Sequence, residues 1–186
     1  WLYSDDPQPY NSWGNGAAMR VTPVGYAFDT VGLVLKEAAR TAEISHNHPE
    51  GVKGAQAAAL AVFLSRQTKD KQLIKKEVSD RFGYNLNRTV EGIRCGYGFD
   101  ISCQGTVPEA IIAFLESDSY EDAVRNAISL GGDSDTLACI TGGIAEAYYG
   151  PVPSEIVRKV QECLPAELWT ITEDFCRAHR HPTADN

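Results

Sequence analysis

Methionine is nearly absent from this chain of 186 residues, which begins at Trp1 and contains only Met19. We therefore expect a piece of a longer polypeptide or a product of processing. No apolar run approaches the roughly 20 residues that a membrane-spanning helix requires, and no signal peptide is recognisable. The 5 cysteines are an odd, scattered set rather than a disulfide framework, which indicates reduced thiols and a cytoplasmic protein.

Positive charge is also in short supply, with 17 Lys and Arg against 25 Asp and Glu and a net charge of −8. This balance argues against nonspecific binding to nucleic acid or to anionic membranes. The alternation of apolar and polar residues that marks strands is nearly absent, whereas the spacing of helices recurs along most of the chain. The sequence predicts an all-α, compact multi-helix protein with a single domain over residues 1–186.

Helical periodicity is strongest in a few well-separated segments. The segment over residues 49–66 is apolar on every side and includes the unbroken run from Ala57 to Leu64, so we expect it at the centre of the core. The segment over residues 107–117 opens near a proline, which suits a first helical turn. The expected helices cover residues 29–44, 49–66, 71–81, 107–117, 119–130, 133–149, 155–163 and 165–178, with residues 96–103 as an irregular connector.

Two carboxylates and a hydroxyl, from Asp133, Asp135 and Thr136, follow a pair of glycines directly ahead of an apolar helical pattern. Hard oxygen ligands of this kind suit Mg²⁺ or Ca²⁺ rather than zinc. The glycines permit a sharp turn, and Asp133 can serve as the N-cap of the helix. A capped helix would explain one aspartate but neither the second acid nor the threonine, so the pattern favours a metal site.

A loop with the sequence NSWGNG covers residues 11–16, and the positions around Asn15 are small or flexible. Its glycines allow backbone amides to approach a ligand closely, as in phosphate-binding loops. The same residues are also ordinary turn formers, so the loop alone decides nothing.

Two further segments carry possible metal ligands. His46 and His48 lie two residues apart between predicted helices, and Cys176 with His179 has a ligand-like spacing. A polar cap explains the first pair better, and chance explains the second, so zinc is not favoured.

The glycine loop, the segment with His46 and His48 and the acidic turn together resemble the motifs of a known family. Taken in order, GNGAAMR over residues 14–20, SHNHPEG over 45–51 and GGDSDT over 131–136 resemble the motifs of the ADP-ribosylglycohydrolases, and the resemblance extends over about residues 9–153. It implies a compact all-α fold with a two-magnesium centre, in which Mn²⁺ could replace Mg²⁺. It also implies hydrolysis of the bond between the anomeric carbon of ADP-ribose and a protein side chain or small acceptor.

The resemblance assigns roles to particular residues. The counterparts of the carboxy-terminal metal ligands are Asp133, Asp135 and Thr136. The counterparts of the loop that holds the diphosphate and adjacent ribose are Ser12, Trp13, Gly14, Asn15 and Gly16. His46 resembles the histidine that reaches bound ADP-ribose.

Other family motifs are missing, among them an amino-terminal Gly-Asp segment and a Thr-Asp-Asp-Thr motif. The run from Ser4 to Asp6 mimics part of the latter, but Pro7 follows directly and the glycine loop lies too close. The chain resembles the carboxy-terminal part of the enzyme, and we expect it to lack the amino-terminal helices, half of the metal ligands and the general acid/base. Apolar surface on residues 57–64 or on residues 140–148 should then be exposed, which favours self-association or a complementing amino-terminal polypeptide.

The mechanism that the resemblance implies is metal-assisted glycoside hydrolysis, in which a carboxylate activates a water or protonates the leaving group. Two other functions stay open: a catalytically inactive module that binds ADP-ribose, and a structural or interaction protein. The acceptor also stays open between arginine, serine, another side chain and a small molecule.

Overall fold

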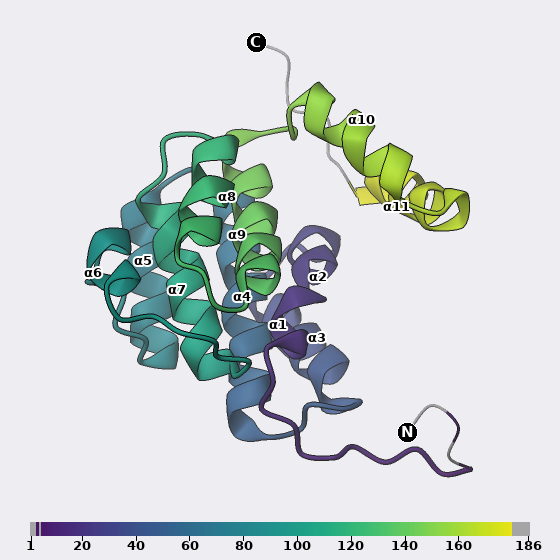
Figure 1. Cartoon of the computed structure of the whole chain (residues 1–186). Coiled ribbons are helices and arrows are strands. Elements are labelled where there is room, and N and C mark those ends of the chain that lie inside the picture. The colour runs from purple at the N-terminus through teal and green to yellow at the C-terminus, as the bar shows by residue number, and fades with distance from the viewer. Residues whose placement is uncertain (1–2, 4, 180–186) are drawn as a thin grey trace. The chain divides into compact units, whose positions relative to one another are not determined.

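The described part of the chain forms helices and no strand. A computed structural model describes residue 3 and residues 5–179 (Figure 1). The chain divides into two compact units, residues 1–150 and residues 151–186, and each is described by itself. The all-α prediction is confirmed, whereas one domain over residues 1–186 stays a prediction.

The helices of the first unit are α1 (Gly16–Met19), α2 (Thr22–Ala27), α3 (Val31–Glu43), α4 (Pro49–Thr68), α5 (Lys71–Phe82), α6 (Val90–Arg94), α7 (Cys103–Leu115), α8 (Tyr120–Ser129) and α9 (Ser134–Tyr149). The second unit contains α10 (Ser154–Cys163) and α11 (Ala166–His179). The long helices agree with the predicted ranges to within two residues, except α7. The helices α1, α2 and α6 were not predicted, because four to six residues are too few to show a helical period.

The helix α4 is the centre of the first unit (Figure 1), where it packs against α1, α2, α3, α5, α7 and α9. Every residue from Ala57 to Leu64 is buried. A helix without a polar face is stable only when neighbours surround it, and the predicted central position is confirmed. The same burial overturns the expectation of exposed apolar surface on this segment. The expectation of exposed apolar surface is also wrong for α9, since Ile140 and Ile144 are buried as well.

The helix α7 begins earlier than the sequence predicts. Its first residue is Cys103, and the Ser102 side chain caps it by accepting a hydrogen bond of 3.1 Å from the Gly105 backbone N–H. Pro108 therefore lies inside the helix instead of in its first turn. The predicted start at residue 107 is wrong because a serine cap upstream determines where the helix begins.

The carboxyl ends of two core helices are capped by lysine ammonium groups. Lys69 Nζ donates to the Ala147 carbonyl of α9 at 2.6 Å, and Lys71 Nζ donates to the Leu115 carbonyl of α7 at 3.1 Å. These contacts satisfy carbonyls that a helix leaves unpaired and place positive charge where the helix dipole favours it. They fix the far ends of the helices whose amino ends approach the candidate site.

Two further predictions concern the whole chain. Among the described residues, no helix combines the length and the apolar character that crossing a lipid bilayer demands. The cysteines are free thiols, as their scattered spacing predicted.

Candidate functional site

The glycine loop lies against the start of α7, although about 90 residues separate them. The Asn15 N–H donates to the Ile101 carbonyl at 2.8 Å, and the Cys103 N–H donates to the Trp13 carbonyl at 2.9 Å. The Cys103 thiol contacts the Gly14 carbonyl oxygen at 3.1 Å. These bonds fix the backbone of the loop, and α1 begins directly after it.

Asn15 joins this loop to the acidic turn at the start of α9. Its Nδ2 donates to Asp133 Oδ2 at 2.6 Å and to Thr106 Oγ1 at 3.0 Å. The side chain is 7% exposed, and a carboxylate only accepts hydrogen bonds, so the amide nitrogen must face Asp133. Two segments separated by 118 residues therefore meet at one buried amide.

The predicted sharp turn ahead of α9 is present, with φ of 74° at Gly131 and 63° at Gly132. A Cβ on Gly132 would lie 2.6 Å from the Gly98 carbonyl oxygen, so only glycine fits there. Asp133 occupies the N-cap position, but its side chain makes no capping hydrogen bond. The prediction that Asp133 caps α9 holds for its position only, because its carboxylate faces Asn15 instead.

The oxygen atoms at the start of α9 fit a hard divalent cation. Asp135 is exposed, and among the residues that the structure describes the hydroxyl of buried Thr136 has the Met19 sulfur as its only partner, at 3.9 Å, which is a weak acceptor. No Lys or Arg in the described part of the chain forms an ion pair with Asp133 or Asp135. Two carboxylates without a countercharge and a hydroxyl with spare lone pairs are donors that Mg²⁺ prefers.

These oxygens supply only part of a coordination sphere. Over residue 3 and residues 5–179, no three His, Cys, Asp or Glu side chains gather closely enough to hold a metal ion. Any cation bound to Asp133, Asp135 and Thr136 would complete its shell with water or with groups outside the described residues.

His46 also lies against the glycine loop. Its Nε2 is 3.5 Å from the position that a Cβ on Gly14 would take and 3.3 Å from the corresponding position on Gly16. The Gly14 Cβ would also lie 3.1 Å from Ser12 Oγ. Gly14 does not have a positive φ, so backbone strain does not require glycine here, and an added Cβ would be tight only against the Ser12 side chain.

Two other loop residues differ in exposure. Ser12 Oγ is half-buried and accepts a hydrogen bond of 3.1 Å from the Gly14 N–H, which shapes the loop. Trp13 is 52% exposed, and its ring contacts His48 edge-on at 5.7 Å between ring centroids. The indole therefore offers an open aromatic face at the edge of the site.

Burial sets the protonation of several groups here. Burial, with a further contribution from the Arg20 guanidinium, lowers the pKa of His46 below its usual 6.5, so the ring is neutral at pH 7. Burial raises the pKa of the Cys103 thiol to about 12 and that of Tyr97 to about 12. Cys103 is therefore a thiol and a hydrogen-bond donor rather than a nucleophile.

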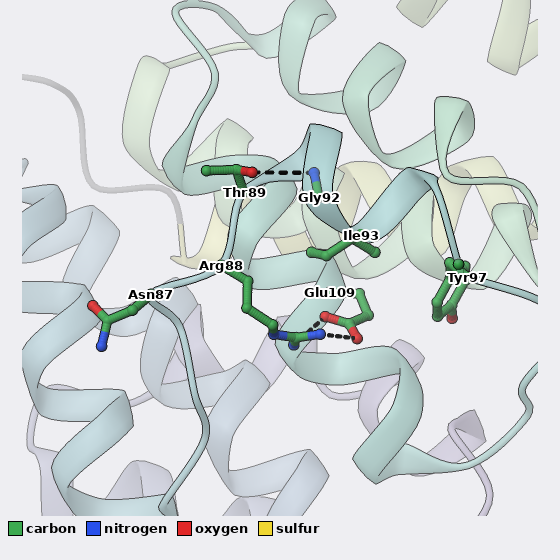
Figure 2. Close-up of a pocket in the computed structure, with 8 residues that line it drawn as sticks. Asn87, Arg88, Thr89, Gly92, Ile93, Tyr97 and Glu109 are labelled. Carbon is green, nitrogen blue, oxygen red and sulfur yellow. Dashed lines mark hydrogen bonds and ion pairs between the residues drawn. The ribbon is translucent and has the colours of Figure 1, made fainter.

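A separate pocket of about 500 Å³ is lined by residues of α6, of α7 and of the segments flanking α6 (Figure 2). Figure 2 shows Arg88 and Glu109 facing each other there, with Arg88 Nη1 2.7 Å from Glu109 Oε1. Tyr97 also lines the pocket and donates to the Gly105 carbonyl at 3.2 Å. Because the guanidinium and the carboxylate neutralise each other, neither charge is left free for a ligand.

Sequence reasoning named the loop residues, His46 and the acids but missed three residues that support them. Thr106 belongs to no recognisable motif, and only the fold brings it to Asn15. Arg20 ends the motif over residues 14–20 and Ser45 begins the motif over residues 45–51, but the sequence assigned a role to neither. Arg20 Nη2 donates to Ser45 Oγ at 2.9 Å, and that oxygen is 2.7 Å from His46 Nδ1.

Comparison with known proteins places the chain in a family. The family model described as ADP-ribosylglycohydrolase matches residues 2–184. The chain belongs to the ADP-ribosylglycohydrolase family. The resemblance noted in the sequence and the all-α fold are thereby confirmed.

Several relatives of this chain are similar over most of its length. ADP-ribosylhydrolase ARH3 of Homo sapiens is 32% identical over 75% of this chain and 51% of that protein. ADP-ribosylarginine hydrolase Tri1 of Pseudomonas putida is 27% identical over 86% of this chain and 44% of that protein. A solved structure titled ADP-ribosylglycohydrolase-related protein complex matches with a TM-score of 0.68 and 27% identity, over 84% of this chain and 59% of that one. The chain thus spans about half the length of the curated relatives it matches.

Proposed function

We propose that this chain forms the ligand loop and part of the metal centre of a magnesium-dependent hydrolase. The hydrolase removes ADP-ribose from a modified protein side chain or a small acceptor. The observation that carries the proposal is the Asn15 amide, which donates to Asp133 Oδ2 at 2.6 Å and so joins the glycine loop to the acidic turn. Family membership and the hydrolases named among the relatives support the same reaction class.

The arrangement suits a ligand that is anionic and rich in hydroxyl groups. At Gly14 and Gly16 the glycine loop approaches the His46 ring closely, with Nε2 3.5 and 3.3 Å from the positions that a Cβ on each glycine would take. The acidic turn is linked to the same loop through Asn15. A diphosphate sugar placed along the loop would therefore reach both an imidazole and the acidic oxygens, and the exposed ring of Trp13 would offer a stacking surface for a base.

The metal ligands of this chain would be Asp133, Asp135 and Thr136, and Mn²⁺ would suit the same oxygens as Mg²⁺. When bound, a divalent cation supplies charge stabilisation and orients the sugar hydroxyls. The Asn15 amide holds the Asp133 carboxylate in one orientation. His46 faces the loop as a neutral ring. The general acid/base is not assigned to any of these residues.

Calorimetry with ADP-ribose, in the presence and absence of MgCl2, tests this proposal on the chain as it stands. We expect binding that Mg²⁺ strengthens, and we expect Asp133→Asn and Asp135→Asn to remove the magnesium effect because each removes one anionic ligand. Asp80→Asn is the matched control, since Asp80 is an exposed carboxylate on α5 that pairs with Lys76. The proposal is wrong if the chain binds no ADP-ribose, or if both site variants respond to Mg²⁺ as the wild type does.

Hydrolysis needs a second assay, on a polypeptide that spans the full length of the relatives rather than about half of it. ADP-ribosylated arginine and serine peptides serve as substrates, with release of ADP-ribose as the readout. We expect turnover that depends on Mg²⁺ and falls at least about a hundredfold in Asp135→Asn, in line with losses on removing a group that stabilises a transition state.

A further inference from the structure

Three residues form a chain of hydrogen bonds that ends at the glycine loop. Arg20 Nη2 donates to Ser45 Oγ at 2.9 Å, and Ser45 Oγ lies 2.7 Å from His46 Nδ1. The guanidinium is held in place because the same Nη2 also donates to the Thr41 carbonyl at 2.8 Å. The far nitrogen of the imidazole, Nε2, faces Gly14 and Gly16.

The donors and acceptors of Arg20, Ser45 and His46 allow one assignment of protons along these hydrogen bonds. A guanidinium only donates, so Ser45 Oγ accepts from Arg20. The Ser45 hydroxyl has one proton of its own, the residue is 7% exposed, and in the part of the chain that the structure describes its one remaining partner is His46 Nδ1. Ser45 therefore donates to Nδ1, which must be unprotonated. In a neutral ring the proton then resides on Nε2.

The surroundings of the ring favour the neutral form that this assignment needs. The Arg20 guanidinium opposes a second positive charge on His46, and burial opposes it more strongly. Tyr10, whose ring centroid is 6.0 Å away, is the aromatic neighbour, and His48 and Glu50 follow in the chain at the start of α4. Nε2 itself makes no hydrogen bond within the described residues and is not sealed from solvent.

We infer that Arg20 and Ser45 are positioning residues that fix His46 in the tautomer with its proton on Nε2. The ring thereby presents an N–H donor to an oxygen of the ligand in the glycine loop. The identity of that ligand, the ADP-ribose moiety, rests on the proposed function, whereas the tautomer does not. The arrangement means that Nε2 donates whether or not Nδ1 is protonated, so the contact survives a fall in pH.

Nitrogen-15 spectra of the histidine rings in the 186-residue chain test the tautomer directly. The His46→Gln variant identifies the His46 signals. We expect the wild type to show a protonated Nε2 and an unprotonated Nδ1 in the neutral ring. A proton on Nδ1 would overturn the inference, and this measurement needs neither a ligand nor a second variant that folds.

Titration of Ser45→Ala adds a test whose sign depends on the direction of the hydrogen bond. If Ser45 donates to Nδ1, its removal takes away a bond that only the neutral ring accepts, so the pKa of His46 rises. If Nδ1–H donated to Ser45 instead, the pKa would fall. Ser45→Thr retains the hydroxyl and should titrate like the wild type. Ser65→Ala removes another buried hydroxyl, one without a hydrogen-bond partner among the described residues, and should also leave His46 unchanged.

Calorimetry with ADP-ribose then connects the tautomer to binding. Ser45→Ala should bind about threefold to tenfold more weakly, the equivalent of one hydrogen bond, and Ser65→Ala should bind like the wild type. Equal affinities of Ser45→Ala and the wild type for ADP-ribose would overturn the inference that His46 presents its Nε2–H to the ligand. If no variant binds ADP-ribose while the spectra show the Nε2 proton, the proposed function fails but the positioning of His46 by Arg20 and Ser45 stands.

Discussion

Replacing Asn15 with alanine removes the buried amide that joins the glycine loop to α9. The variant loses one hydrogen bond to a carboxylate, worth ~1.5–3 kcal/mol, and one to a neutral hydroxyl, worth ~0.5–1.5 kcal/mol. Thr106 keeps a second partner, the Asp100 carbonyl at 3.2 Å, whereas the half-buried Asp133 carboxylate loses the hydrogen bond from Asn15. We therefore expect the free energy of unfolding to fall by about 2–4 kcal/mol.

Urea denaturation followed by circular dichroism measures this loss. Asn85→Ala is the matched control, because Asn85 is exposed and its side chain accepts only one local hydrogen bond, 3.1 Å from the Asn87 N–H. Surface changes of this kind stay within about 0.5 kcal/mol. If Asn15→Ala were no more destabilising than Asn85→Ala, the amide would not hold the two segments together and the argument for one joined site would be refuted.

The remaining predictions concern charge and space around the site. Asn15→Asp sets a second carboxylate against Asp133, which raises the pKa of one of the two carboxyl groups. The variant should therefore become less stable, relative to the wild type, as the pH rises from about 4 to 7. The readout is the urea midpoint, which should fall over this range. Gly14→Val should weaken ADP-ribose binding about tenfold or more in calorimetry while the fold persists, since the side chain would crowd Ser12 Oγ at 3.1 Å. Gly132→Ala should lower the free energy of unfolding by about 1–3 kcal/mol more than Gly83→Ala does. Both glycines have a positive φ, but of the two only Gly132 meets a neighbouring backbone. Equal losses of stability in thermal unfolding would argue against that contact.

Much of the fold could be predicted because the local signals agree with the tertiary environment. The all-apolar segment that became α4 has one stable place, the centre of the core, and its position was predicted correctly. The start of α7 was missed because Pro108 suggested a first turn while the Ser102 cap, five residues before Val107, determined it. The expected exposed apolar faces were also wrong, since the first unit buries them within itself.

The candidate site was predictable only as separate pieces. The glycine loop, His46 and the acids each stand in a short motif whose chemistry can be interpreted locally. Their arrangement could not be predicted, because the contact of Asn15 with Asp133 and the role of Thr106 depend on how distant helices pack. Arg20 and Ser45 stood in the quoted motifs, but a hydrogen-bond chain becomes visible only when both ends are placed.

The separation of Asn15 and Asp133 along the chain also has a kinetic consequence. Helices form within microseconds from local contacts, whereas a contact across 118 residues requires the chain to close a long loop. The segments on either side of the amide can therefore be helical well before they meet. A refolding experiment that follows ADP-ribose binding should therefore report a slower phase than one that follows helix content. The rate at which binding is recovered would measure the last long-range step of folding.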